Sequence, residues 1–262
     1  MPSKQYVPEF WTPFEIQVGD QTVTCNLGTD SDVAEDASLC IIPTQARNVV
    51  EDPAGTAEKP NVMTQWLDML TDAGARILLF HGHWFDKLSV LVEMAREGED
   101  GFALWQQRLD GVVAEALRRG YATPGRVVLM GSSRHGFAVL HGGPNNKDVS
   151  AIVAWGPVTY WPRLKEFAGM DGNPVIQAND IFGWTERYPP RPLLIQTGYD
   201  DDRVGSDLHL RLAALLTEAY FEAGADNKFT YHVINIPGHS LGPKPDIAFD
   251  YPLAWLRRNG YL

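Results

Sequence analysis

Cysteine is scarce in this chain. Only Cys25 and Cys40 occur among the 262 residues, and neither belongs to a C-x-x-C pair or lies at a metal-ligand spacing from histidine. We interpret both as small buried residues in strands, with a disulfide between them as the alternative. Phosphate-cradling glycine loops are also missing after the first strands. These absences predict a protein that uses neither a metal nor a cofactor.

Positive charge is scarce too, with 22 Lys and Arg against 33 Asp and Glu and a formal net charge of −11. Nucleic-acid binding is not expected, because it depends on basic side chains that neutralise phosphates. No apolar run approaches the length that spans a bilayer, and the first residues lack the apolar core of a signal peptide. We therefore expect a cytoplasmic protein without membrane contact. A homo-oligomer is compatible with the sequence.

What the chain does have is an alternation of strand-like and helix-like runs, with 44% hydrophobic residues. Strands are expected at 10–18, 22–27, 38–42, 76–80, 126–130, 150–155, 192–196 and 231–236. Amphipathic helices are expected at 61–73, 101–119, 208–223 and 246–258. This order predicts a single α/β domain over residues 1–262. Its sheet should be twisted, mostly parallel and covered by helices on both faces, with an antiparallel hairpin at its start.

The stretch around Ser133 carries the strongest functional signal. Strand-like residues 126–130 lead into a turn of small and polar residues with Ser133 at its apex, and a helical stretch to His141 follows before Gly142-Gly143 ends it. A nucleophile on such a strand–turn–helix elbow projects above the sheet, with a helix N-terminus behind it that favours negative charge. Ser133 is therefore the candidate nucleophile.

The small residues of this elbow follow the G-x-S-x-G pattern only in part. Gly131 and Ser133 match it, His135 occupies the second small position, and Gly136 comes one place later. We interpret His135 as a structural accommodation, with a hydrogen bond from its ring to the cap or a neighbouring loop as the alternative. A residue two positions after the serine points away from its Oγ, so His135 is not expected to be the catalytic base.

Partners for the serine follow at the ends of two later strands. The run 192–196 leads to three consecutive acids, Asp200, Asp201 and Asp202, and the run 231–236 leads to His239. The chain order serine, acid, histidine is that of α/β-hydrolases and differs from the orders of the chymotrypsin and subtilisin folds.

On these residues the chain resembles an α/β-hydrolase, and most closely a prolyl-oligopeptidase-like serine hydrolase without a propeller domain. The likeness runs from about residue 35 to the end. It is carried by an elbow and an acid loop, in which the matching residues are Gly131, Ser133, Gly136, Phe137, Gly198, Asp201 and Val204. The resemblance implies a catalytic triad of Ser133, Asp201 and His239, with Asp201 favoured over its two neighbours, and His135 departs from the pattern.

Two backbone N–H groups are expected to form an oxyanion hole. The first belongs to Arg134, directly after the serine, and the second to Gln45 or Thr44, in the loop after the strand 38–42. An ordinary polar loop is the alternative for the second position. His81 and His83 form an H-x-H pair without a third ligand nearby, so we interpret them as structural histidines at a strand end.

Residues 157–190 interrupt the regular alternation with glycine, proline and aromatic residues. An insertion at this point of such a fold commonly forms a cap over the active site, and its aromatic side chains can line a substrate pocket. The candidate substrate-binding residues here and nearby are Trp84, Trp155, Trp161, Phe182 and Trp184. Packing of the cap onto the body of the domain is the alternative role for each of them.

Three functions are compatible with these residues. The first is an esterase that cleaves a small or medium acyl ester through an acyl-enzyme intermediate, because an aromatic-rich cap suits an apolar substrate. The second is a peptidase or amidase of the prolyl-oligopeptidase type. The third is a non-catalytic ligand-binding protein on a hydrolase scaffold. The fold does not fix the function, so the choice depends on the site.

Overall fold

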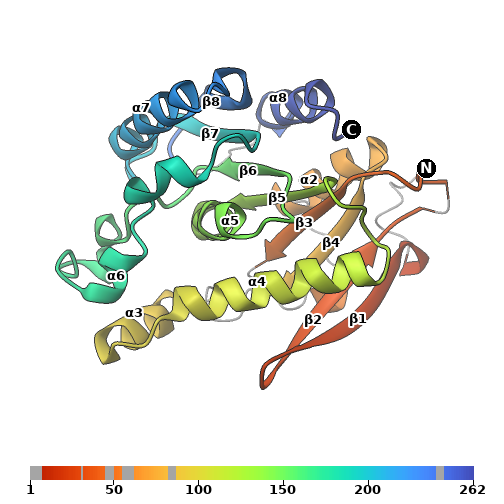
Figure 1. Ribbon diagram of the computed structural model, residues 1–262, viewed down its shortest axis with the longest axis horizontal. Helices are drawn as coiled ribbons and strands as arrows, with labels where there is room; N and C mark the ends of the chain where they lie inside the picture. Colours follow the sequence, from red (N-terminus) through yellow and green to blue (C-terminus); the bar gives the residue numbers. More distant parts are fainter. Residues whose placement is uncertain (1–7, 31, 45–49, 55–61, 82–86, 240–244) are drawn as a thin grey trace.

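The computed structural model describes residues 8–30, 32–44, 50–54, 62–81, 87–239 and 245–262. In this part of the chain eight strands form one sheet in the order β1-β2-β4-β3-β5-β6-β7-β8 (Figure 1). The pairs β1–β2 and β2–β4 are antiparallel and the other neighbours are parallel. The strands are β1 (Trp11–Val18), β2 (Gln21–Gly28), β3 (Leu39–Thr44), β4 (Arg76–His81), β5 (Val127–Ser132), β6 (Ala151–Trp155), β7 (Leu193–Asp200) and β8 (Phe229–Pro237).

Helices cover both faces of the sheet, as the alternating pattern predicts. One hydrophobic core lies under α2 and α8, and the other lies under α4, α5 and α7. The helices are α2 (Val62–Asp72), α3 (Leu88–Glu97), α4 (Gly101–Arg118), α5 (Ser133–Asn145), α6 (Pro174–Ala178), α7 (Ser206–Glu222) and α8 (Pro245–Arg258). The central strands β3 and β6 are buried along their whole length, which explains why they read as unbroken apolar runs. The mostly parallel α/β architecture is confirmed.

The predicted end of the helix after Ser133 is wrong. That helix, α5, continues through Gly142 and Gly143 to Asn145. A Cβ on Gly142 would lie 2.2 Å from Leu109 Cδ2, and a Cβ on Gly143 would lie 2.3 Å from Ile152 Cδ1. The two glycines therefore let α5 approach α4 and β6 closely, which a reading of glycine as a helix terminator misses.

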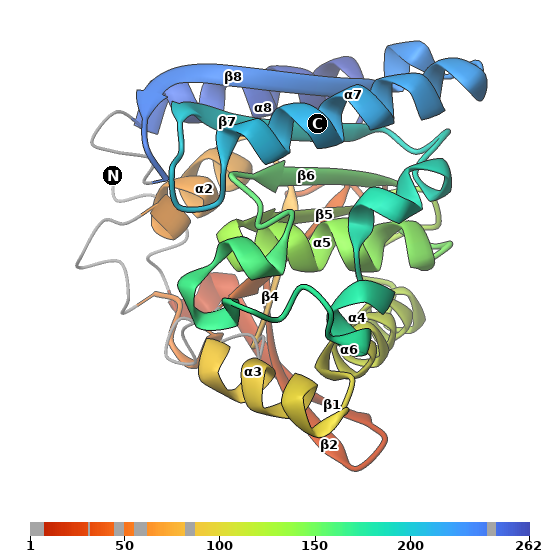
Figure 2. The same cartoon turned by 90° about the vertical axis from the view of Figure 1, so that its left-hand side faces the viewer.

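Residues 157–190, which we call the cap segment, form short helices joined by irregular chain. It contains α6 and three 3-10 turns, and it packs along α3, α5 and α7 (Figure 2). Several hydrogen bonds tie it to α5, including one in which Tyr188 Oη donates to the Leu140 carbonyl at 2.9 Å and one between His141 Nε2 and Asn179 Oδ1 at 2.7 Å. The cap segment is thus fixed to the same helix that carries Ser133 at its N-terminus.

Cys25 and Cys40 lie in β2 and β3, and both are buried free thiols, so the interpretation as small core residues is confirmed and the disulfide is not formed. No helix among the described residues is long and apolar enough to cross a membrane.

Candidate active site

Ser133 occupies a strained turn between β5 and α5. It has a φ of 55°, and it is the one non-glycine residue with positive φ in the described part of the chain. Such a conformation costs on the order of 1–3 kcal/mol, and the surrounding packing must hold it in place. A Cβ on Gly131 would lie 2.3 Å from the carbonyl oxygen of His135, so the first small residue of the elbow is required by this close backbone approach.

The structure brings Ser133, His239 and Asp201 together. Ser133 Oγ lies 2.8 Å from His239 Nε2, and His239 Nδ1 lies 2.8 Å from Asp201 Oδ2. Each residue lies just beyond the carboxyl end of a different strand: Ser133 follows β5, Asp201 follows β7 and His239 follows β8. Parallel strands place these loops at one edge of the sheet.

Asp201 is the acid that meets the histidine, whereas Asp200 and Asp202 are exposed. Burial raises the pKa of Asp201, but the hydrogen bond from His239 and the backbone N–H of Val204 outweigh it and hold that pKa below the ordinary value. The carboxylate is therefore ionised at neutral pH and can only accept hydrogen bonds.

The charge of Asp201 fixes the tautomer of His239. Because the carboxylate accepts, Nδ1 of His239 carries the proton and donates it. Nε2 is then the unprotonated acceptor that faces the hydroxyl of Ser133. This arrangement can remove the serine proton and store it on a ring whose cation is stabilised by Asp201.

His135 is buried and does not face the Ser133–His239 contact. Only 3% of the residue is exposed, and its ring lies edge-on to Trp105 of α4, with 6.4 Å between the ring centroids. Burial, with Arg134 and His81 adding to it, lowers the pKa of His135 to about 3, so the ring is neutral. The close contact with the chain at the end of β6 occurs instead at Gly136, where a Cβ would lie 2.9 Å from Pro157 Cα and 3.3 Å from the Trp155 carbonyl.

Arg134 and Thr44, two of the three residues expected to bind an oxyanion, are among the described residues. Arg134 is in the first turn of α5, whose N–H groups are not used by the helix itself. Thr44 ends β3, which pairs in parallel with β5 at Leu39–Ile41, so Thr44 and Ser133 lie at the same end of the sheet. Gln45, the other candidate for the second donor, is outside the described residues, as is Trp84.

The candidate pocket aromatics occupy different environments. Trp155 is buried between Trp66 and Phe249 in the core beneath α2 and α8. Trp161 is buried against Phe102 and Phe137. Phe182 and Trp184 are partly buried and lie under the guanidinium groups of Arg211 and Arg187, at 4.9 and 4.5 Å from the ring centroids. Each ring therefore packs the cap segment or the body.

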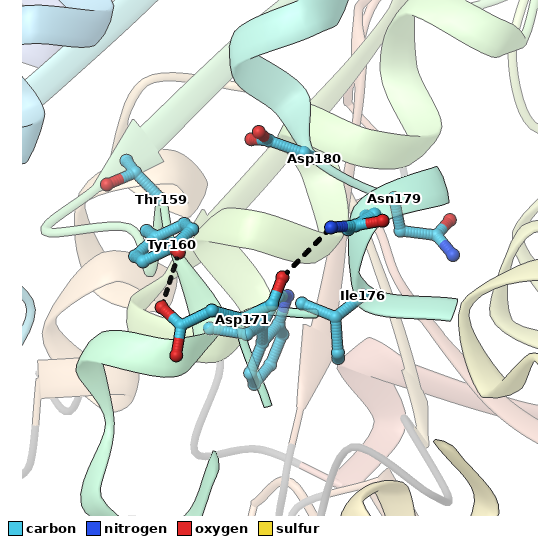
Figure 3. A pocket seen from close by; sticks show the side chains of 8 residues that line it. Thr159, Tyr160, Asp171, Ile176, Asn179 and Asp180 are labelled. Carbon is cyan, nitrogen blue, oxygen red and sulfur yellow. Dashed lines mark hydrogen bonds between the residues drawn. The ribbon is translucent and has the colours of Figure 1, made fainter. Parts of the chain in front are cut away.

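A cavity of about 210 Å³ lies in the cap segment (Figure 3). Its lining is mixed, with Tyr160 Oη donating to Asp171 Oδ1 at 2.8 Å and Gln177 donating to the Asp171 carbonyl at 3.2 Å. Thr159, Trp161, Ile176, Asn179 and Asp180 complete the lining. Thr159 follows Val158, whose N–H donates to the carbonyl of Ser133 at 3.0 Å, so the chain that lines the cavity starts at the elbow.

Two residues beside the triad were not among the sequence candidates. Gly156, with a φ of 42°, faces the acid and the histidine: a Cβ there would lie 3.7 Å from Asp201 Oδ2 and 3.8 Å from His239 Nδ1. His209 is buried in the first turn of α7. The sequence holds a signal for each, because Gly156-Pro157 directly follows a strand and His209 shares the helical spacing of Leu212 and Leu216.

No family model matches the chain, and no curated protein matches its sequence. Solved structures do resemble it. Dipeptidyl peptidase 4 from Porphyromonas gingivalis superposes with a TM-score of 0.71 at 14% identity, over 95% of this chain and 35% of that one. Est1E from Butyrivibrio proteoclasticus has a TM-score of 0.66 at 13% identity, over 94% of this chain and 98% of that one. The esterase domain of a Rhodothermus marinus protein has a TM-score of 0.64 at 16% identity, over 95% and 98% of the two chains.

These likenesses concern the fold. Together with the strand order they show that the chain has the α/β-hydrolase fold. The chain spans about a third of the length of the dipeptidyl peptidase and nearly the whole length of the two esterase structures.

Proposed function

We propose that the protein is a serine hydrolase that cleaves a small or medium acyl ester through an acyl-enzyme intermediate. The observation that carries the proposal is the continuous contact from Ser133 Oγ through His239 to a buried, ionised Asp201, at 2.8 Å in each step. A serine on an ordinary surface turn needs neither the positive φ nor this orientation of the histidine.

In the proposed reaction each of the three side chains has a distinct role as the acyl group moves. Ser133 Oγ attacks the ester carbonyl while its proton passes to His239 Nε2, and Asp201 stabilises the resulting imidazolium. The tetrahedral oxyanion is held by the N–H of Arg134 and a second backbone N–H at the end of β3 or directly after it, from Thr44 or Gln45. His239 then gives its proton to the leaving alcohol, and water repeats the sequence to release the acid.

Substrate class is inferred from the cap segment, whose aromatic residues suit an apolar ester. Trp161 lines the cavity of the cap segment besides packing against Phe102 and Phe137, and it is the aromatic residue we propose to approach the acyl or alcohol group.

A peptidase or amidase is the second candidate. Its support is the higher TM-score of the dipeptidyl peptidase, at a sequence identity as low as that of the esterases. A non-catalytic ligand-binding protein is disfavoured, because a scaffold without chemistry has no need to keep three side chains in this orientation.

The test is hydrolysis of a panel of chromogenic acyl esters and aminoacyl amides by wild type, Ser133→Ala and Ser132→Ala. Ser132 is the matched control, because it lies in the same turn and its side chain makes no capping hydrogen bond to α5. We expect ester turnover that falls by roughly 10⁶-fold in Ser133→Ala only. Turnover of amides alone would replace the esterase by the peptidase, and equal activity in all three proteins would end the proposal.

A further inference from the structure

His209 makes a hydrogen bond that fixes its own protonation. It is 1% exposed, and its Nε2 lies 2.7 Å from the carbonyl oxygen of Pro157. A carbonyl can only accept, so Nε2 of His209 carries the proton and donates it. Nδ1 is buried without a hydrogen-bond partner among the described residues. Burial lowers the pKa of His209 more than Pro157 and Asp201 raise it, so the ring is a neutral donor.

The acceptor belongs to a three-residue segment, Gly156–Val158, that touches every part of the triad. Val158 N–H donates to the carbonyl of Ser133 at 3.0 Å. Pro157 lies against Gly136, where a Cβ would come within 2.9 Å of Pro157 Cα. Gly156 lies beside Asp201 and His239, and no side chain separates it from them. Displacement of this segment would therefore move the nucleophile relative to its base.

His209 belongs to the same local unit as the acid. The N–H of Asp201 donates to Ser206 Oγ at 2.8 Å, and the N–H groups of Gly205 and Ser206 return to the Asp201 carbonyl at 3.1 and 3.0 Å. His209 lies one turn further along α7. Its bond to Pro157 therefore connects the chain from β7 to α7, which carries Asp201, to the Gly156–Val158 segment, which contacts Ser133.

We infer that His209 is a positioning residue: its Nε2–H holds the Gly156–Val158 segment and so sets Ser133 against the His239–Asp201 pair. The inference rests on the proposed serine hydrolase function. A misplacement of about 1 Å between reacting groups can cost roughly 100-fold in rate. Loss of the His209 donor is therefore expected to slow the chemical step by about 10- to 100-fold with little change in KM.

A matched pair of amide side chains tests this. In His209→Gln the amide nitrogen reaches about as far as Nε2 of histidine and can donate to Pro157, whereas His209→Asn has the same group one carbon shorter. His209→Leu removes the donor altogether, and Leu216→Ala weakens the packing of α7 two turns away without touching Pro157. Each protein is assayed for its rate of labelling by a fluorophosphonate, for kcat and KM on an ester, and for its melting temperature.

We expect His209→Gln to label within about threefold of wild type, and His209→Asn and His209→Leu to label 10- to 100-fold more slowly with KM nearly unchanged. Leu216→Ala should label at the wild-type rate below its melting temperature. Labelling at the same rate by His209→Gln and His209→Asn, whether fast or slow, would overturn the positioning role. Slow labelling by Leu216→Ala would overturn it too, if the labelling rates of all variants simply followed their losses in melting temperature. If wild type itself is not labelled while folded, the proposed hydrolase function is what fails.

Discussion

Gly136 and Pro157 lie so close that a Cβ on Gly136 would come within 2.9 Å of both Cα and Cβ of Pro157 and within 3.3 Å of the Trp155 carbonyl. This contact between α5 and the end of β6 is where the elbow needs a residue without a side chain. His135, one position earlier, turns its ring toward Trp105 in the core instead. The chain therefore satisfies the packing of the elbow with glycines at positions 131 and 136.

Replacing Gly136 by alanine should disturb the elbow. The added methyl group would overlap backbone atoms that cannot rotate away, so we expect a loss of about 1–3 kcal/mol in unfolding free energy and slower fluorophosphonate labelling. Gly183→Ala is the control, because a Cβ there meets no atom within 4 Å and the φ of Gly183 is not positive. Urea unfolding and labelling of both variants measure the effect. A Gly136→Ala protein as stable and reactive as Gly183→Ala would contradict the close contact.

Asp201→Asn should lower kcat on the best ester by roughly 10⁴-fold, as expected when a triad acid loses its charge. The amide cannot stabilise the His239 cation and can face Nδ1 with a donor, which favours the wrong tautomer. Asp202→Asn should stay near wild type, because that side chain is exposed while Asp201 makes the contact with His239. Steady-state kinetics compare the two, and a large loss in Asp202→Asn with a small loss in Asp201→Asn would reassign the acid.

Acid should destabilise the protein partly through His141. Burial lowers the pKa of His141 to about 4, whereas the unfolded chain keeps a value near 6.5. Between these values the unfolded state binds the extra proton, so stability falls as pH drops from about 6.5 toward 4, by up to about 1.4 kcal/mol per pH unit. His141→Gln removes this titration and can still donate to Asn179. Urea unfolding at pH 7, 6 and 5 should show a shallower decline for the variant, and parallel curves would refute the assignment.

Both cysteines should be silent toward thiol reagents in the folded protein. Burial raises the pKa of Cys25 and Cys40 to about 12, and the thiolate is the reactive form. A colorimetric disulfide reagent should titrate no thiol in native buffer and two thiols per chain in guanidinium chloride. Detection of a fast native thiol would show that β2 or β3 opens to solvent.

The fold was predictable because apolar residues recur at helical spacing in its helices and form short continuous runs in its strands. All eight expected strands start within about two residues of their predicted starts, and β7 ends at Asp200 rather than at the predicted Gln196. The helix α3 was not predicted, and the end of α5 was placed too early at Gly142-Gly143. The continuation of α5 depends on tertiary packing, because Gly142 and Gly143 pack against Leu109 of α4 and Ile152 of β6.

The proximity of Ser133, Asp201 and His239 was predictable because each follows a strand in a fixed chain order, and Asp201 is the one of the three consecutive acids that contacts His239. The role of Gly156 and His209 was not. A glycine after a strand and a histidine on the apolar face of a helix are common, and only the neighbours brought by folding distinguish them.

The strand order also sets when the site can form during folding. Ser133 and His239 are 106 positions apart in the sequence, and His239 follows β8, an edge strand that pairs only with β7 in the described sheet. Contacts between such distant positions close late, because the intervening chain must first lose its entropy. In a nascent chain that has not yet docked β8, the elbow can be complete while His239 is still distant from it. The proposed nucleophile Ser133 therefore meets its proposed base only when the last strand joins the sheet.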